Sequence, residues 1–121
     1  MKFQEMIKKV QVYSGFSDRE SKEALEHLVE SLAVHLTEGE RKDFASQLPQ
    51  ELQDIALSVM ATEENSTKDI LQDFVEIQGI GENRAKKQIL SAWKTLKDAI
   101  SPGQIAHIQA QLPAAATYLL Q

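Results

Sequence analysis

Apolar residues recur at three- and four-residue steps along most of the chain, which is the spacing of amphipathic α-helices. The first stripe predicts a helix from about residue 3 to residue 14, ended by Gly15. Further helices are expected at about residues 17–36, 38–47 and 50–60, on the stripes of 70–77 and 85–100, and after Pro102 and Pro113. We therefore predict an all-α protein of about eight helices.

One segment of this pattern occurs twice. Residues 37–49 return as residues 101–113, an offset of 64 positions (101 minus 37). Each copy begins with a hydroxyl residue followed three positions later by Glu40 or Gln104, which predicts a capping box at both helix starts. Each copy ends in Gln-Leu-Pro, because the residue before a proline leaves the α region. A further capping box is expected at residues 17–20.

The repeat extends over nearly the whole chain. Without a gap, residues 3–57 align with residues 67–121, and residues 62–66 form a polar connector. Identical residues stand at helix ends and core positions: Gly15/Gly79, Lys22/Lys86, Leu32/Leu96, Gly39/Gly103, Gln47/Gln111, Leu48/Leu112 and Pro49/Pro113. A repeat unit that cannot bury its apolar face alone stacks on its neighbour. We predict one domain, residues 1–121, in which two pseudo-equivalent four-helix repeats share one core.

Composition narrows the class of protein. Among 121 residues, 42% are hydrophobic and 26% are charged, which is typical of a globular chain. The absence of cysteine excludes disulfides and thiolate metal sites. The chain begins with an amphipathic helix instead of an apolar leader, and no run approaches the roughly 20 apolar residues of a membrane span. We expect a cytoplasmic protein with no membrane contact.

The order of these features resembles a known family. Gly15, the cap at residues 17–20, the long helix up to Leu36, Thr37-Glu38-Gly39-Glu40 and the segment 45–52 are similar to the bacterial family catalogued as domain of unknown function 2267. The resemblance covers nearly the whole chain, although the second copy departs from it at residues 102–104 and 114–116. It implies an all-helical fold of two related halves, and it supplies no catalytic residues.

A glycine turn in the second copy suggests a nucleic-acid contact. Residues 74–90 are similar to the helix-hairpin-helix element, in which a Gly-hydrophobic-Gly turn opens a helix whose free N–H groups hold a backbone phosphate. The residues that would contact phosphate are Gly79, Ile80, Gly81, Arg84, Lys86 and Lys87. Nucleic-acid binding through this turn is our alternative function.

Several observations favour a structural role for the same turn. The first copy carries Gly15-Phe16-Ser17 at the equivalent place, Gln78 replaces the usual proline, and Glu82 would put an anion beside the phosphate. The net charge of −5 also disfavours a general nucleic-acid binder. We expect nucleic acid not to be the partner.

No constellation of catalytic or metal-binding residues is apparent. His27 and His35 are eight residues apart, about 12 Å along a helix, which is too far to share a metal ion, and His107 stands alone. Glu20, Glu23, Glu26 and Glu30 could suggest carboxylate ligation, but a solvated helix face explains them better. We expect a non-enzymatic protein with no catalytic residue, no cofactor and no metal.

The end of the chain is uncharged. Residues 99–121 contain no Asp, Glu, Lys or Arg. Six large apolar residues of the last two expected helices predict a face that is not left in water: Ile105, Ile108, Leu112, Tyr118, Leu119 and Leu120. That face lies either inside the monomer or in a subunit or partner interface, and we favour the interface. The sequence thus favours a protein–protein interaction module that binds a protein partner or forms a homodimer.

Overall fold

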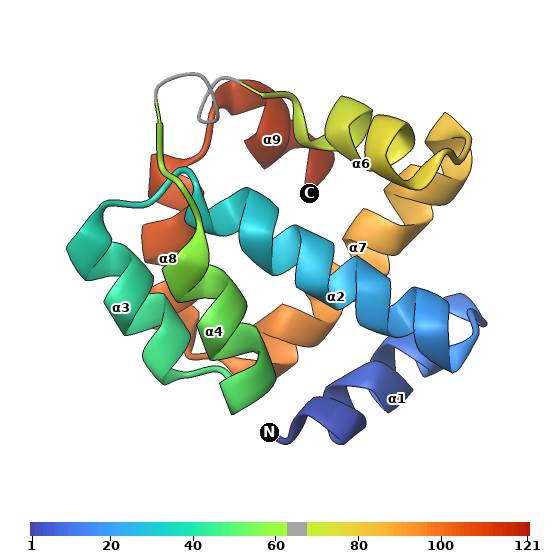
Figure 1. Ribbon diagram of the computed structural model, residues 1–121, viewed down its shortest axis with the longest axis horizontal. Helices are drawn as coiled ribbons and strands as arrows, with labels where there is room; N and C mark the ends of the chain where they lie inside the picture. The colour runs from blue at the N-terminus through green and yellow to red at the C-terminus, as the bar shows by residue number, and fades with distance from the viewer. Residues whose placement is uncertain (63–67) are drawn as a thin grey trace.

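The computed structural model describes residues 1–62 and 68–121, and there the chain forms eight α-helices and no strand (Figure 1). The helices are α1 (Phe3–Ser14), α2 (Asp18–Ala33), α3 (Glu38–Ser46), α4 (Gln50–Ser58), α6 (Ile70–Gln78), α7 (Glu82–Ala99), α8 (Pro102–Gln111) and α9 (Ala114–Leu119). The all-α prediction is therefore confirmed. Of the predicted connector at residues 62–66, all but Thr62 lies outside the described residues.

The two longest helices, α2 and α7, pack against each other and organise the rest (Figure 1). The first helix, α1, packs against both of them, so it joins the two halves of the chain. In the first half, α4 packs on α2 and α3 packs on α4, while in the second half α6 packs on α7. Figure 1 shows α9 on the opposite side of α2 from α1.

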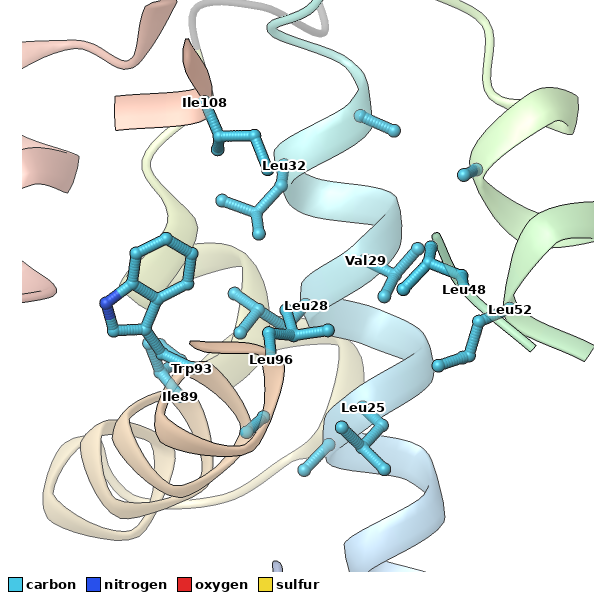
Figure 2. Packing of buried hydrophobic residues seen from close by; sticks show 14 of the residues in the cluster. Leu25, Leu28, Val29, Leu32, Leu48, Leu52, Ile89, Trp93, Leu96 and Ile108 are labelled. Carbon is cyan, nitrogen blue, oxygen red and sulfur yellow. The ribbon is translucent and has the colours of Figure 1, made fainter. Parts of the chain in front are cut away.

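One hydrophobic cluster runs through these helices and contains residues from both halves. Figure 2 shows α2 at its centre, with Val29 directed toward Leu48 and Leu52 and with Leu28 directed toward Leu96. All five of these side chains are at most 4% exposed. Burying a side chain of this size stabilises the folded state by about 1.5–3 kcal/mol. Because α2 buries such side chains against residues of both halves, it is the main apolar support of both.

The segments after α2 and α7 bury matched positions. Residues 44, 48, 52 and 56 of the first copy and residues 108, 112, 116 and 120 of the second are all at most 9% exposed. The matched pairs are Phe44/Ile108, Leu48/Leu112, Leu52/Ala116 and Ala56/Leu120. The alignment at an offset of 64 residues thus places buried positions opposite buried positions.

Two predicted helices end earlier than expected. The α2 helix ends at Ala33 instead of Leu36, because the amides of His35 and Leu36 bond to carbonyls three residues back, which tightens the last turn. The α4 helix ends at Ser58 instead of residue 60, since Val59 adopts an extended conformation. Gly15 and Gly79 end α1 and α6 in the left-handed region, with φ of 78° and 62°.

The predicted capping boxes differ from one another. The Thr37 box is complete: its hydroxyl accepts from the Glu40 amide and the Glu40 carboxylate accepts from the Thr37 amide. Ser101 accepts from the Gln104 amide, but its own amide donates to Oε1 of Gln47 at 2.7 Å. A side chain of the first half therefore completes the cap of the second, which corrects the prediction for Gln104.

The third predicted box, at residues 17–20, is also only half formed. Ser17 caps α2 by accepting from the Glu20 amide, while the Glu20 carboxylate binds Arg84 and Gln88 of α7. The carboxylate turns away from the helix start because two charged or polar donors of the other half lie within reach. Both incomplete boxes thus use their free group to connect the two halves.

Candidate functional site

The Gly79–Gly81 turn has the geometry of a helix-to-helix connection. The amides of Gly79 and Ile80 both donate to the carbonyl of Val75, which closes the end of α6. Gly81 then stands at the N-cap of α7 without a side-chain capping bond. Gly15 ends α1 in the same left-handed conformation, so the turn is shared by both hairpins. Its glycine at φ 62° is explained by helix termination alone.

The cations predicted beside this turn bind other groups of the chain. Arg84 forms a bidentate pair with Glu20, with Nε at 2.8 Å from Oε2 and Nη2 at 2.5 Å from Oε1. The hydrogen bond from Arg84 lowers the pKa of the Glu20 carboxyl, and Glu20 raises the pKa of Arg84. Lys86 lies 3.7 Å from Glu82 on its own helix. These two charges are partly neutralised before any phosphate arrives.

The aromatic ring of the first turn lies beneath the same helix. Arg84 stacks over Phe16 with its guanidinium carbon 4.7 Å from the ring centroid, and Lys87 lies over the same ring at 5.5 Å. Phe16 is only 6% exposed. The predicted phosphate contacts Arg84 and Lys87 therefore cover the hydrophobic residue of the other hairpin, which gives them a structural role.

The structure corrects most of the predicted interface. Ile105, Ile108, Leu112 and Leu120 are at most 9% exposed and belong to the core of the single chain. They cannot form an exposed contact face, because they pack into the hydrophobic cluster of the single chain. Leu119 is half-buried, and Tyr118 is 79% exposed.

An apolar groove lies beside Tyr118. It has a volume of about 480 Å³ and is bounded by the start of α6, the outer side of α7 and α9. Apolar side chains from all three helices line it: Leu71, Leu90, Ala115, Ala116, Tyr118 and Leu119. Lys68 and Lys86 stand at its rim. We call this the α9 groove.

Sequence reasoning missed the exposure of Leu90. Leu90 is 40% exposed although it is a large apolar side chain. A signal was present, since Lys86 and Lys94 stand four residues to either side and place Leu90 on the charged face of α7. Leu71 was assigned to the core stripe of its helix, and only the packing of α9 shows that it borders a groove.

Other titratable groups with shifted pKa values hold helices together. The Tyr13 hydroxyl donates to Asp98 at 2.5 Å, which raises the pKa of Tyr13 and lowers that of Asp98. Lys9 lies 3.3 Å from the same carboxylate. This cluster fixes α1 to the end of α7. Burial alone lowers the pKa of His35.

The histidines are not grouped for metal binding. His27 stacks on Phe74 with ring centroids 4.1 Å apart, and its Nε2 lies 3.2 Å from the Asp73 carboxylate. His107 is exposed on α8. Within residues 1–62 and 68–121, no three His, Cys, Asp or Glu side chains are close enough together to hold a metal ion. In the same part of the chain, no helix combines the length and apolar content that crossing a bilayer requires.

In comparison with known proteins, nearly the whole chain matches one protein family. Residues 3–119 match the family model described as "Uncharacterized conserved protein (DUF2267)". Searches of the curated proteins and of the solved structures found no match to this chain. The match covers nearly the whole chain, as the resemblance in the sequence implied.

Proposed function

We propose that this chain, which belongs to the DUF2267 family, is a cytoplasmic bacterial protein-binding module without an active site, and that its binding surface is the α9 groove. The observation that supports this most is the groove itself, about 480 Å³ in volume and lined by apolar side chains of three helices. Exposed apolar surface that is rimmed by polar residues is typical of protein-binding sites.

The occupant that we propose is an amphipathic helix of a partner protein with acidic residues beside its apolar stripe. Helices lay apolar anchors spaced by three and four residues into such grooves. Lys68 and Lys86 line the groove together with Asp69, and Lys86 also lies 3.7 Å from Glu82. Residues 84–97 contain no acidic residue although the chain carries a net charge of −5. With two lysines against one aspartate, the groove lining is more positive than the average surface of this acidic chain, which favours an acidic partner.

A binding role also agrees with the titratable groups. Glu20 and Arg84 shift each other's pKa, as do Tyr13 and Asp98, and each pair connects one half of the chain to the other. None of these groups lines the α9 groove. The shifted pKa values of these four groups thus follow from contacts between helices, without a catalytic role.

The second candidate is nucleic-acid binding through Gly79–Gly81. The free N–H groups of a helix start favour it, and the pairing of Arg84 with Glu20 and of Lys86 with Glu82 disfavours it. We rank it below protein binding because the cations would first have to leave these partners.

The test uses two labelled model peptides that form amphipathic helices, with identical leucines and either Glu or Lys on the polar flanks. In fluorescence anisotropy, the acidic peptide should bind with a micromolar Kd that weakens as salt is raised, and the basic peptide should bind at least ten-fold more weakly. Leu90→Asp should abolish binding. Leu57→Asp is the matched control, because Leu57 is also exposed, at 52%, but lies on α4 outside the groove.

Three outcomes would contradict the proposal. Equal binding of both peptides would mean that charge does not select the partner. A dimer in light scattering that Leu90→Asp dissociates would make a second copy the occupant. Salt-sensitive binding of labelled duplex DNA that Lys87→Glu removes, without any peptide binding, would favour the Gly79–Gly81 alternative.

A further inference from the structure

A second concave surface lies between α2 and the hairpin of α6 and α7, away from the α9 groove. Its volume is about 580 Å³. The α2 wall carries Glu20, Glu23, Glu26 and Glu30, and the opposite wall carries Ile77 and Ile80 together with Gln88. We call this the glutamate cleft. Its two walls therefore differ in chemistry: the α2 wall is acidic, and the opposite wall combines Ile77 and Ile80 with the polar residues Gln78, Arg84 and Gln88.

Half of its carboxylates have no partner. Glu20 binds Arg84, and Glu23 binds Arg19 at 3.1 Å, so these two charges are balanced within the cleft. No hydrogen bond or ion pair to the side chain of Glu26 or Glu30 occurs in the described residues 1–62 and 68–121. Glu26 is moreover half-buried. The cleft thus retains negative charge after its internal pairs are formed.

Gln88 adds an unused acceptor that is buried. The residue is 1% exposed, and its Nε2 donates to Oε2 of Glu20 at 2.7 Å. A carboxylate only accepts hydrogen bonds, so this contact fixes which end of the amide is nitrogen. The Oε1 atom has no partner anywhere in the described part of the chain. A buried carbonyl oxygen without a donor is unfavourable, and a ligand N–H would relieve it.

The other groups of the cleft restrict what the ligand can be. His27 is already engaged, with one ring nitrogen at Asp73 and the other within 3.4 Å of the Gln78 amide. The carboxylates are not clustered for a metal ion, as far as the described residues show. The unfilled groups are all acceptors, and Ile77 offers a side chain that is 66% exposed. The best match is a cation with several N–H donors and an apolar chain.

We infer that the glutamate cleft binds alkylammonium groups, with one ammonium donating to Glu26 and Glu30, a second donating to the Gln88 carbonyl oxygen beside Glu20, and the methylene chain between them lying along Ile77 and Ile80. Glutamates three or four residues apart on a helix are about 5–6 Å apart, which suits ammonium groups separated by a short carbon chain. Glu20 and Glu30 span about 15 Å of helix axis, enough for a linear triamine. Free polyamines and lysine side chains share this chemistry.

The experiment is isothermal titration calorimetry of the full chain with spermidine and, separately, with an acetylated peptide that carries two lysines four residues apart. We expect saturable binding with one site per chain. Glu26→Gln combined with Glu30→Gln should weaken it at least ten-fold. Tighter binding of spermidine would identify a free polyamine as the ligand, whereas tighter binding of the peptide would identify lysine side chains. Either result supports alkylammonium recognition.

The matched control is Glu5→Gln combined with Glu51→Gln, which removes the same charge at exposed positions outside the cleft. It should change the affinity less than two-fold. The Gln88 side-chain amide resonance should shift with spermidine in the wild type and not in the Glu26/Glu30 variant. An equal loss of affinity in both double variants, displacement by an equal concentration of Mg²⁺, or the absence of saturation would overturn the inference. Urea denaturation checks that both variants stay folded.

Discussion

The helix pairs α3–α4 and α8–α9 show that charge content and burial are separate properties. Both pairs bury the four aligned positions 44/108, 48/112, 52/116 and 56/120, yet residues 38–43 carry charges on their outer side and the whole of α8 and α9 carries none. The outer side of α8 is nevertheless in water, because Ala106, His107 and Gln109 are exposed. Uncharged residues at an exposed surface therefore do not by themselves indicate an interface.

The pairs also differ in how they fill equivalent space. The first copy places leucine at position 52 and alanine at position 56, whereas the second places Ala116 and Leu120 at the aligned positions. All four are at most 7% exposed. A large residue has thus changed places with a small one along the same helix face, and the side-chain volume of the two positions together is kept.

The largest effect should come from truncating the aligned core residues Phe44 and Ile108, both fully buried. Phe44→Ala should lower the free energy of unfolding by about 3–5 kcal/mol and Ile108→Ala by about 2–5 kcal/mol, because each leaves a cavity. Urea denaturation measures both. Gln109→Ala, on the exposed side of α8, should change the free energy of unfolding by less than about 0.5 kcal/mol.

The same measurement distinguishes core from interface. If Ile108 lies in the core of the monomer, the loss of stability is independent of protein concentration. A loss that disappears on dilution would mean that Ile108 contacts a second copy, contrary to its burial within one chain.

A smaller effect is expected when the first copy is given the arrangement of the second. Leu52→Ala alone should lower the free energy of unfolding by about 2–4 kcal/mol. Adding Ala56→Leu should restore more than half of that loss, because α4 then fills its face as α9 does. The comparison fails if the double variant unfolds at a lower urea concentration than Leu52→Ala.

Much of the fold was predictable because its signals are local. Apolar spacing, the Gly15 and Gly79 turns and the Gln-Leu-Pro ends located the helices to within about two or three residues. The hydrogen-bond partners of side chains that bridge the two halves were not predictable from the sequence. Glu20 and Gln104 both fit a capping box in sequence, and only the approach of Arg84 and Gln47 decides their bonds.

The candidate site was less predictable than the fold. The interface prediction followed the uncharged end of the chain, although Ile108 and Leu112 align with Phe44 and Leu48, which the same reading placed in the core. The exposure of Leu90 and Ile77 depends on which helices fail to cover them. That property depends on the whole packing, so apolar spacing within one helix cannot report it.

Removing either cap contact should lower the free energy of unfolding by about 1 kcal/mol. Glu40→Ala removes a bond within one helix start, and Gln47→Ala removes the acceptor of the Ser101 amide in the other half. Gln47 also donates from Nε2 to the Ser101 hydroxyl at 3.3 Å, and Ser101→Ala removes that hydroxyl while keeping the amide. A double-mutant cycle should therefore couple Gln47→Ala to Ser101→Ala by about 0.5 kcal/mol or more, while Glu40→Ala and Ser101→Ala add independently. Additivity in both cycles would show that the Gln47 side chain does not bind the Ser101 hydroxyl.

The smallest effect concerns Glu20 and Arg84, which stand at aligned positions and pair with each other. The hydrogen bond from Arg84 lowers the Glu20 pKa below its ordinary value of 4.5, so the unfolded chain takes up this proton first as the pH falls. The stabilisation is present above pH 4.5 and is lost as the pH falls through the folded-state pKa. Glu20→Gln should cost up to about 1 kcal/mol at pH 7, and urea titrations at lower pH should show the difference shrinking.

The packing of α1 on α7 has a consequence for synthesis on the ribosome. Tyr13 and Lys9 meet Asp98 across 85 and 89 residues of sequence. The chain grows at about 5–20 residues per second, so α1 must wait for several seconds before its partner surface leaves the exit tunnel. Throughout that interval α1, with its buried residues Met6, Ile7 and Val10, lacks its packing against α7. A chaperone that binds apolar segments near the tunnel exit would therefore meet α1 first.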